Sequence, residues 1–370
     1  MHIVLLFTFD YSLETWANSG HLQRELRFYN LLVENGFKVT FITYGDSADL
    51  KILKNSKIDV FPIYSSTNKS NYRILNLLKS FYFPFLIKRN IFFKPGNTII
   101  KQNQLLGSWV AIILKLITKS KLYMRTGYDM YLFSIKNKKG FFKRILYFIL
   151  TQKTILFSDI YSVTSSSDLI FLKSRFFNTK KLVKRPNWVD VDLSNNSFEK
   201  NKILAVGRLE NQKNFKELIS ESAGTDFEIN IYGEGSKKND LLNQARELDV
   251  KIKIFNNVEN SELLDIYKNY KYFVSTANFE GNSKVILEAM SRGCVVIAKD
   301  IENNREIIKH MESGLLFKEN LNEILKNCKE NQYDNLNFIE NAIEVIRKDY
   351  NFEKIFLNYI SDFNLLLKTD

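Results

Sequence analysis

The stretch KILAVGRLENQKNFKELI, residues 202–219, carries the pattern that determines the fold. It opens with a short aliphatic run, passes through a polar loop that starts with glycine, and ends in a segment with the apolar spacing of a helix. A buried strand followed by a helix is the repeating unit of a parallel sheet whose two faces are covered by helices. This stretch therefore predicts an α/β fold.

The same alternation extends in both directions along the chain. We expect strands at 2–9, 38–44, 98–101, 121–125, 160–164, 202–206, 227–232, 251–255, 272–275 and 294–298. Helical patterns fall at 20–34, 105–118, 141–157, 166–176, 336–347 and 352–367, with further helices between the later strands. Strands and helices in alternation favour doubly wound parallel sheets.

A polar stretch with a proline, RPNWVDVDLSNNSFEK at 185–200, interrupts the alternation. It has the composition of a linker between domains. We therefore expect an N-terminal Rossmann-like domain at 1–185, a linker at 186–200, a second Rossmann-like domain at 201–350, and a C-terminal helix at 351–370 that packs back on the first domain.

Composition sets limits on the class of protein. The 370 residues are 45% hydrophobic, which is enough for two buried cores. Cys294 and Cys328 cannot form a disulfide framework and show no zinc-site spacing, which favours a reducing compartment. No apolar run reaches the roughly 20 residues that a membrane-spanning helix needs, and the opening MHIVLLFTFD has the pattern of a buried strand, not of a signal peptide.

The net charge of +12 is distributed unevenly. Residues 1–185 contain 29 Lys and Arg against 10 Asp and Glu, whereas the remainder contains 24 against 31. No acid occurs between Asp59 and Asp129, and the segment LLKSFYFPFLIKRNIFFK, 77–94, interleaves cations with aromatic residues. We expect most aromatic residues of 81–93 to fill the core and the basic excess to face an anionic membrane surface.

Three strand ends supply residues suited to binding a diphosphate. Gly207, Arg208 and Lys213 follow one strand, the GEG triplet that starts at Gly233 follows the next, and ANFEGNSK, 277–284, opens a later helix. Ligands of open α/β sheets bind at the carboxyl ends of strands, where helix N-termini and cations attract phosphates. The acids Glu280 and Glu288, eight positions apart, can accept hydrogen bonds from hydroxyls on either side, so the set predicts a nucleotide-sugar site.

These segments resemble the retaining glycosyltransferases of family 4. The resemblance rests on VGRLENQKNFKELI, INIYGEGSKKNDLLNQARELDV, FEGNSKVILEAMSRGCVVIAKD and RPNWVDVD, in this order, and covers nearly the whole chain. It implies the GT-B fold, with two Rossmann-like domains facing a cleft and C-terminal helices crossing back. It also implies a sugar transfer from a nucleoside diphosphate to a saccharide acceptor with retention of configuration.

The resemblance assigns roles to individual residues. Arg208 and Lys213 would neutralise the donor diphosphate, Glu280 would contact the donor sugar, and Glu288 the ribose. The remaining donor-binding positions that it implies are Gly207, Gly233, Gly281, Asn282, Ser283, Lys284 and Val285.

The first domain fits the family pattern more loosely. Gly20, Arg125 and Asp129 occupy the positions expected on the acceptor side. The family often has two adjacent glycines where this chain has Ser19 and Gly20, and a His-Gly element is replaced by MRTGYDMYLF, 124–133. In the second domain, Asn256 and Asn257 stand where a glycine is common, which leaves base recognition open.

We expect neither a cofactor nor a metal. The DVD triplet at 190–192 has the composition of a metal-binding DxD motif, but it lies in the linker. The donor is expected to be UDP- or GDP-linked, and the acceptor a lipid-linked saccharide or a lipopolysaccharide, capsule or cell-surface glycan. From the basic first domain we expect an enzyme in the cytoplasm, peripheral on the inner face of the membrane.

Other functions remain open. A nucleotide-sugar epimerase or a phosphorylase can share the GT-B fold, but the sequence shows neither the epimerase set of acids and histidines nor a lysine site for pyridoxal phosphate. A basic nucleic-acid-binding protein would carry a recognisable motif, and none is present. A non-catalytic sugar-nucleotide-binding protein is the remaining alternative, and a turnover assay separates it from an enzyme.

Overall fold

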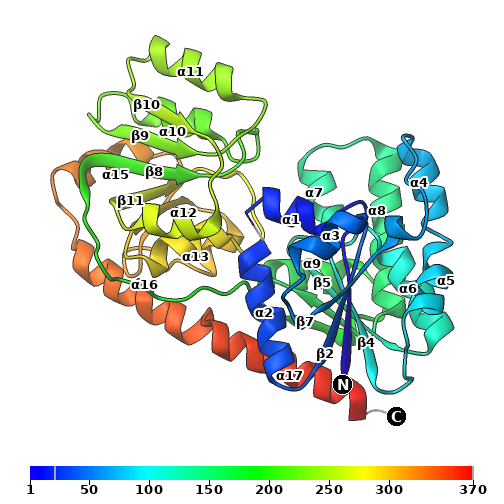
Figure 1. Cartoon of the computed structure of the whole chain (residues 1–370). Helices are drawn as coiled ribbons and strands as arrows, with labels where there is room; N and C mark the ends of the chain where they lie inside the picture. Colours follow the sequence, from blue (N-terminus) through cyan, green and yellow to red (C-terminus); the bar gives the residue numbers. More distant parts are fainter. Residues whose placement is uncertain (21, 369–370) are drawn as a thin grey trace. The chain divides into compact units, whose positions relative to one another are not determined.

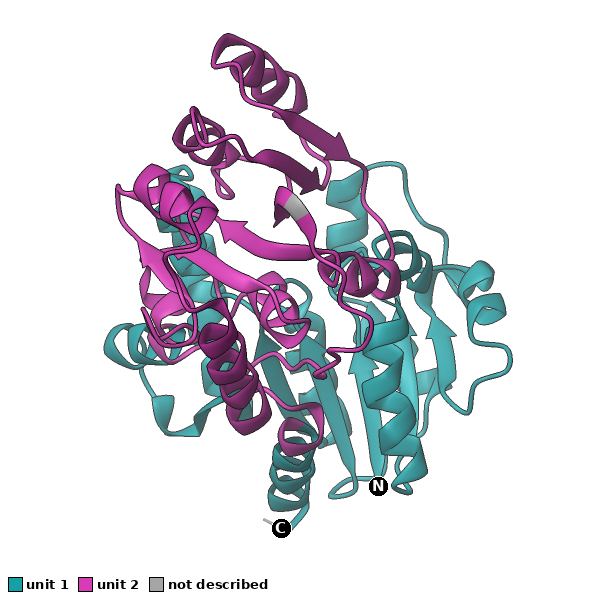
Figure 2. Ribbon diagram, turned by 90° about the vertical axis from the view of Figure 1, so that its left-hand side faces the viewer, with its two compact units in different colours: residues 1–164, 168–185, 356–370 teal, residues 165–167, 186–355 magenta. Residues whose placement is uncertain are grey.

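The computed structural model describes residues 1–20 and 22–368, apart from the side chain of Lys200 (Figure 1). The chain forms two compact units (Figure 2). Unit 1 contains Met1–Thr164, Asp168–Arg185 and Phe356–Asp370, and unit 2 contains Ser165–Ser167 and Pro186–Ile355. Most of the polar stretch at 185–200 is therefore counted with unit 2.

Unit 1 is built on a parallel sheet of seven strands in the order β3-β2-β1-β4-β5-β6-β7. The strands are β1 His2–Leu6, β2 Lys38–Thr43, β3 Asp59–Pro62, β4 Thr98–Asn103, β5 Lys121–Thr126, β6 Ile160–Val163 and β7 Leu182–Lys184. The strand order reverses between β1 and β4. Almost every residue of β1 is fully buried, as expected for a sheet with helices on both faces.

The helices of unit 1 connect successive strands of this sheet. They are α1 Leu13–Asn18, α2 Leu22–Glu34, α3 Ser47–Ile52, α4 Arg73–Lys79, α5 Phe83–Asn90, α6 Ser108–Thr118, α7 Met130–Lys136, α8 Phe141–Phe157 and α9 Ser166–Arg175, with short 3-10 turns at Ile63–Ser65 and Thr179–Lys181. The predicted helix at 20–34 corresponds to α2, and the short helix α1 that precedes it is not predicted; the chain turns between them at Gly20, whose φ is +68°.

The last helix, α17 Phe352–Lys368, belongs to unit 1 from Phe356 onward. Asp362 on this helix accepts two hydrogen bonds from Arg185, at 2.8 and 2.5 Å, and one from the hydroxyl of Tyr123 at 2.9 Å. Phe363, one position further, is fully buried. A paired and hydrogen-bonded buried carboxylate is costly to disrupt, so Asp362 fixes α17 to the sheet of unit 1.

Unit 2 is built on a second parallel sheet, of six strands in the order β10-β9-β8-β11-β12-β13. The strands are β8 Glu199–Val206, β9 Glu228–Tyr232, β10 Ile252–Phe255, β11 Tyr270–Ser275, β12 Val295–Lys299 and β13 Leu315–Phe317. The order reverses between β8 and β11. Ile203 packs into the core on one face of the sheet, and its neighbour Leu204 packs into the core on the other face.

Helices cover both faces of this second sheet. They are α10 Phe215–Glu221, α11 Lys238–Glu247, α12 Asn260–Tyr267, α13 Lys284–Ser291, α14 Glu302–Arg305, α15 Leu321–Lys329 and α16 Asn335–Asp349. The prediction of two doubly wound parallel sheets is therefore confirmed.

One prediction about the core is wrong. Of the aromatic residues at 81–93, Phe83 is buried, whereas Phe81, Tyr82, Phe85 and Phe92 are at least half exposed. Phe81 and Tyr82 lie in the turn between α4 and α5, Phe85 lies on α5, and Phe92 lies in the loop after α5. Within the described part of the chain, no helix combines the length and the apolarity that crossing a bilayer requires.

Candidate functional site

Two loops of unit 2 meet where its strand order reverses. Residues 207–214 follow β8, and residues 276–283 follow β11, which is the parallel neighbour of β8. The side chain of Gln212 donates to the carbonyl of Phe279 at 3.0 Å, and the amide of Asn278 donates to the carbonyl of Gln212 at 3.0 Å. The reversal point is where ligands of open α/β sheets bind, so these joined loops form the candidate site.

Lys213 and Glu280, two of the predicted catalytic residues, form an ion pair in this site. The Nζ atom of Lys213 lies 2.5 Å from Oε1 of Glu280, and the two side chains are only 14% and 12% exposed. The pair holds one positive and one negative charge at the same strand edge. An arriving phosphate would therefore share Lys213 with Glu280, while Glu280 keeps an oxygen for a second donor such as a hydroxyl.

Arg208, the third predicted catalytic residue, is exposed at the start of the first loop. Its guanidinium donates to Oε1 of Gln212 at 3.3 Å. Because Gln212 is neutral, this contact orients the guanidinium without neutralising it. Gln212 thus holds Arg208 with one end of its amide and Phe279 with the other, a positioning role that sequence reasoning missed.

Positions 207 and 233 favour glycine because other atoms lie close to the point where a Cβ atom would be placed. A Cβ atom on Gly233 would lie 2.0 Å from the carbonyl oxygen of Gly207, which is backbone and cannot move aside. A Cβ on Gly207 would lie 2.7 Å from Cε of Lys213. The space above Gly207 is thus filled by the stem of Lys213, which directs its ammonium group toward Glu280.

Helix α13 begins directly after the second loop, so its N-terminus lies at the site. The first amides of a helix have no partner within the helix and carry the positive end of its dipole. Ser283, at the N-cap position, is buried, and its hydroxyl has no hydrogen-bond partner among the described residues. Amides and a spare hydroxyl at this point suit a phosphate oxygen.

Asn282 makes a structural contact in addition to the donor contact expected of its backbone amide. Its side-chain oxygen accepts from the amide of Asn187 at 2.8 Å, and the side chain of Asn187 donates to its carbonyl at 2.6 Å. Both residues are buried. The side chain of Asn282 therefore fixes the loop at Gly281–Ser283 to the chain that enters unit 2, and Asn187 is a second positioning residue that sequence reasoning missed.

Glu288 is the fifth residue of α13, just over one turn from its start, and is almost fully buried. Its carboxylate accepts from Asn260 at 3.0 Å and from the hydroxyl of Tyr267 at 3.4 Å, both on α12. Burial, reinforced by the charge of Glu288, raises the pKa of Tyr267 well above its usual value. The two predicted acids thus differ: Glu280 faces a cation, and Glu288 faces neutral donors.

The predicted acceptor-side residues lie in unit 1. Gly20 forms the turn after α1 with φ of +68°, and Arg125 at the end of β5 donates to the hydroxyl of Tyr359 at 2.8 Å. Asp129 is fully buried, caps α7 by accepting from the amide of Leu132 at 2.6 Å, and has a pKa that burial raises to about 7. These contacts give Arg125 and Asp129 structural roles in addition to any acceptor role.

The DVD triplet is engaged in ion pairing and backbone contacts. Asp192 pairs with Lys268 at 2.7 Å and accepts from Ser194, and the hydrogen bond to Lys268 lowers its pKa far below the usual range. The carbonyl of Asp190 accepts from Arg292. No three His, Cys, Asp or Glu side chains in the described ranges are grouped so as to hold a metal ion.

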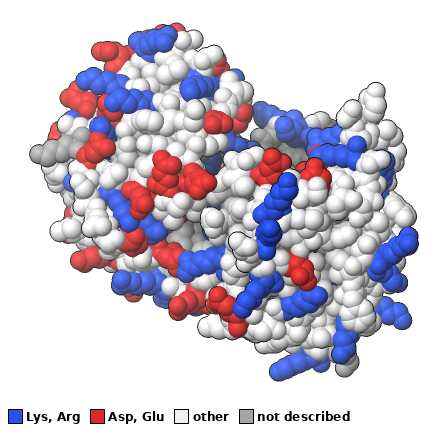
Figure 3. Space-filling view, in the orientation of Figure 1, with Lys and Arg blue, Asp and Glu red and all other residues white. Residues whose placement is uncertain are grey.

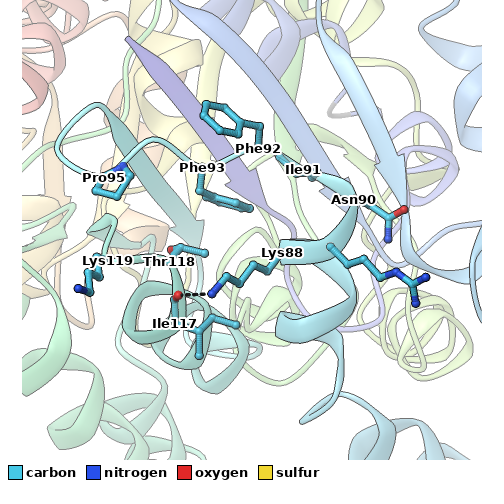
Figure 4. A pocket seen from close by; sticks show the side chains of 10 residues that line it. Lys88, Asn90, Ile91, Phe92, Phe93, Pro95, Ile117, Thr118 and Lys119 are labelled. Carbon is cyan, nitrogen blue, oxygen red and sulfur yellow. Dashed lines mark hydrogen bonds between the residues drawn. The ribbon is translucent and has the colours of Figure 1, made fainter.

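A hollow of about 580 Å³ lies elsewhere, at the ends of α5 and α6 (Figure 4). Lys88, Arg89 and Lys119 contribute cations, and Phe92, Phe93 and Ile117 contribute apolar surface. Lys88 donates to the carbonyl of Ile117 at 2.8 Å. The strands β4 and β5 begin just after these segments, so the hollow lies at the amino-terminal edge of the sheet, and none of the predicted site residues lines it.

A protein-family model matches most of unit 2, which holds this site. Residues 192–345 match the family Glycosyl transferases group 1. The matched region begins in the polar stretch before β8 and includes both loops of the candidate site. The part of the chain that carries Arg208, Lys213, Glu280 and Glu288 is thus the part that resembles this glycosyltransferase family.

Two curated glycosyltransferases resemble longer stretches of the chain. One is the N-acetylgalactosamine-N,N'-diacetylbacillosaminyl-diphospho-undecaprenol 4-alpha-N-acetylgalactosaminyltransferase of Campylobacter jejuni, which is 28% identical over 65% of the chain and 65% of its own length. The other is the UDP-Gal:alpha-D-GlcNAc-diphosphoundecaprenol alpha-1,3-galactosyltransferase of Escherichia coli, 26% identical over 48% of the chain and 56% of its own length. The matches thus span less than two thirds of either relative.

A solved structure resembles the whole chain. The HepE protein of Anabaena, in complex with UDP, superposes with a TM-score of 0.74 over 98% of this chain and 100% of its own, at 15% identity. At this identity the likeness shows the fold alone. The fold is GT-B, with two Rossmann-like domains.

Proposed function

We propose that the protein is a retaining glycosyltransferase of family 4, which moves a sugar from a nucleoside diphosphate to a saccharide acceptor without a metal ion. The observation that carries the proposal is the Lys213–Glu280 ion pair at the strand reversal of unit 2, beside the N-terminus of α13. The family match over residues 192–345 supports it.

The chemistry needs a site for the diphosphate that leaves. Arg208, Lys213 and the first amides of α13 supply positive charge and hydrogen-bond donors where negative charge develops in the transition state. A fixed set of this kind can replace the divalent ion that many glycosyltransferases use for the same purpose. Glu280, held by Lys213, accepts hydrogen bonds from hydroxyls of the donor sugar.

In the proposed reaction, the bond between the anomeric carbon and the phosphate oxygen breaks, and the acceptor oxygen bonds to the same face of the sugar. The proton of the acceptor hydroxyl passes to an oxygen of the departing phosphate. The products are the glycosylated acceptor and a nucleoside diphosphate, so no protein nucleophile is consumed. Attack on the face from which the phosphate leaves retains the configuration.

The names of the relatives support a proposal for the donor and acceptor classes. We infer a UDP- or GDP-linked sugar, since one relative is named for a UDP sugar and one structural neighbour binds UDP. The names of both relatives contain an undecaprenol-linked diphosphate, which supports a lipid-linked saccharide as the acceptor. We infer that an enzyme acting on such an acceptor works at the cytoplasmic face of the membrane, in the synthesis of a cell-surface glycan.

Thermal shift with a panel of nucleoside diphosphates and their sugars tests the donor class. A ligand at about 100 times its dissociation constant stabilises the folded protein by about 2.7 kcal/mol, a readily measured shift. We expect UDP or GDP to stabilise the wild type and Lys216→Ala, whose lysine is exposed on α10, and to fail with Lys213→Ala. Equal shifts for all three proteins would reject the site.

A turnover assay separates the enzyme from a sugar-nucleotide-binding protein. The nucleotide sugar that gives the largest shift is incubated with lipid-linked saccharides, and released nucleoside diphosphate is measured. Release that depends on the acceptor supports transfer. Binding without release across the panel would support the non-catalytic alternative.

A further inference from the structure

Helix α8 turns its apolar side chains toward solvent. Phe141 and Phe142 are 71% and 87% exposed, and Leu146, one turn further, is also exposed. By contrast, Thr151 and Thr154 of the same helix are fully buried. A surface helix of a soluble protein normally buries its apolar residues, so the first turns of α8 are reversed in the sense that they expose phenylalanine and leucine side chains to solvent.

Helix α4 shows the same reversal. Ile74 is 74% exposed, and Leu78, on the same face, is 61% exposed. The inward position is taken by Asn76, whose side chain is buried and hydrogen-bonds the amide and the carbonyl of Ser70 at 2.8 and 2.7 Å. The buried polar group is satisfied locally, and the leucine and isoleucine side chains are left outside.

The two reversed helices flank α6. The hydroxyl of Ser80, just after α4, accepts from the indole of Trp109 at 2.8 Å, and Thr154 of α8 donates to Ser108 at 2.9 Å. Phe81 stacks on Trp109 with ring centroids 6.4 Å apart. We call the exposed apolar side chains Ile74, Leu78, Phe81, Phe141, Phe142 and Leu146 the α4–α8 face.

Charge around this face is almost entirely positive. Between Asp59 and Asp159 the sequence has one acid, Asp129, and that side chain is fully buried. Lysine and arginine residues on the same helices include Arg73, Lys79 and Lys143. Along the right-hand margin of Figure 3, on the side where Figure 1 draws α4 and α5, lysine and arginine atoms stand among uncharged ones.

We propose that the α4–α8 face inserts into the interfacial layer of an anionic bilayer, with its Phe, Leu and Ile side chains among the acyl chains and its cations on the lipid phosphates. Exposed apolar side chains gathered on neighbouring helices mark an interaction site, and cations beside them favour anionic lipid. A second copy of the chain is disfavoured as the occupant, because a symmetric contact would bring two cationic faces together.

The position of the face in unit 1 suits this role. Helix α4 follows the carboxyl end of β3, and α7 and α8 follow the carboxyl end of β5. Gly20, Arg125 and Asp129 lie on loops or strand ends of the same edge. The proposal does not depend on the donor site of unit 2, but it would bring a membrane-held acceptor to the edge where acceptor binding is proposed.

Flotation of the full chain with lipid vesicles tests the proposal. We expect binding to phosphatidylcholine vesicles that contain phosphatidylglycerol and little binding to phosphatidylcholine alone. Phe141→Ser/Phe142→Ser should reduce binding at least tenfold, and Lys143→Glu should reduce it mainly at low salt. Leu336→Ser/Leu357→Ser removes two leucines that are exposed on other helices and should bind as the wild type does.

Tryptophan fluorescence reports separately whether the face inserts into the bilayer. The emission of Phe142→Trp should shift to the blue on anionic vesicles and be quenched by brominated acyl chains. Equal vesicle binding by the wild type and Phe141→Ser/Phe142→Ser would overturn the proposal. So would a wild-type dimer that this double variant converts to monomers while neither binds vesicles.

Two controls separate this proposal from the proposed function. Phe141→Ser/Phe142→Ser should keep the thermal shift with UDP or GDP, which shows that unit 2 is folded and binds. Lys213→Ala should keep vesicle binding while losing the nucleotide shift. Loss of vesicle binding in Lys213→Ala would contradict the independence of the two sites.

Discussion

The ammonium group of Lys213 lies 2.5 Å from the carboxylate of Glu280, although 67 positions separate the two residues in the sequence. Neighbouring parallel strands bring them together, because one follows β8 and the other opens the approach to α13. Glu280 partly neutralises the positive charge that Lys213 offers to an anion. Removal of Lys213 should therefore weaken anion binding, and removal of the Glu280 charge should not.

Glu280→Gln should uncouple nucleotide binding from sugar transfer. Without the carboxylate, Lys213 is free for the phosphates, so UDP or GDP should bind as well as or better than in the wild type. Turnover should fall by about 10²- to 10³-fold, as is typical when a group that acts in the transition state is lost. Isothermal titration and a product assay measure the two effects. A weakening of nucleotide binding equal to that of Lys213→Ala would count against the shared lysine.

Gly233→Ala should destabilise unit 2. Its Cβ would meet the carbonyl of Gly207 at 2.0 Å, and forcing an atom into a packed site costs about 1–3 kcal/mol. Thermal denaturation measures the loss, and nucleotide affinity should fall with it because the Gly207 loop is displaced. Gly140→Ala is the control, since nothing lies within 4 Å of the point where its Cβ would be placed and its φ is −56°. Equal melting temperatures for the two variants would contradict the close approach.

Asp362→Ala should release α17 from unit 1. The change leaves Arg185 without its carboxylate and Tyr123 without its acceptor, and breaking a buried pair of this kind costs about 3–5 kcal/mol. Urea denaturation gives the free energy of unfolding. Glu353→Ala, an exposed acid of the same helix, should change it by less than about 0.5 kcal/mol. Equal free energies of unfolding for Asp362→Ala and Glu353→Ala would contradict the role of Asp362 in holding α17.

Asp129 should make the stability of the protein depend on pH. Burial raises its pKa from 3.8 to about 7 in the folded state, so the folded protein keeps a proton that the unfolded chain releases. The free energy of unfolding therefore has its full contribution below pH 3.8 and loses it as the pH rises to about 7.

Asp129→Asn isolates this effect because asparagine is also a good helix cap. Relative to the variant, the wild type should lose stability between about pH 4 and pH 7, at up to about 1.4 kcal/mol per pH unit. Denaturation series at several pH values measure the difference. A constant difference across the range would show that the carboxyl group is ionised in the folded state.

The sequence suffices for most of the buried strands and for the loops that follow them, although it does not predict the three-residue strands β7 and β13. The second half of β8, residues 203–206, is an aliphatic run, and the glycine and cations after it are read directly from 202–219. The helical pattern at 141–157 has the same bounds as helix α8, Phe141–Phe157. Strand β3, Asp59–Pro62, is not predicted because it is short, only partly buried and contains a proline.

Contacts between segments that lie far apart along the chain could not be predicted from the sequence. The bonds between Asn187 and Asn282 join residues 95 positions apart, and asparagine alone does not indicate its partner. The aromatic residues at 81–93 are expected in the core because hydrophobic residues are usually buried. Composition does not reveal which side of a helix faces out, and here Phe81 and Phe85 face solvent.

The most direct test of the central claim is a crystal structure of the chain with UDP or GDP bound, whichever gives the larger thermal shift. We predict the diphosphate within hydrogen-bond distance of Arg208 and Lys213 and of the first amides of α13. A diphosphate bound elsewhere in the molecule, with these groups uninvolved, would contradict the account.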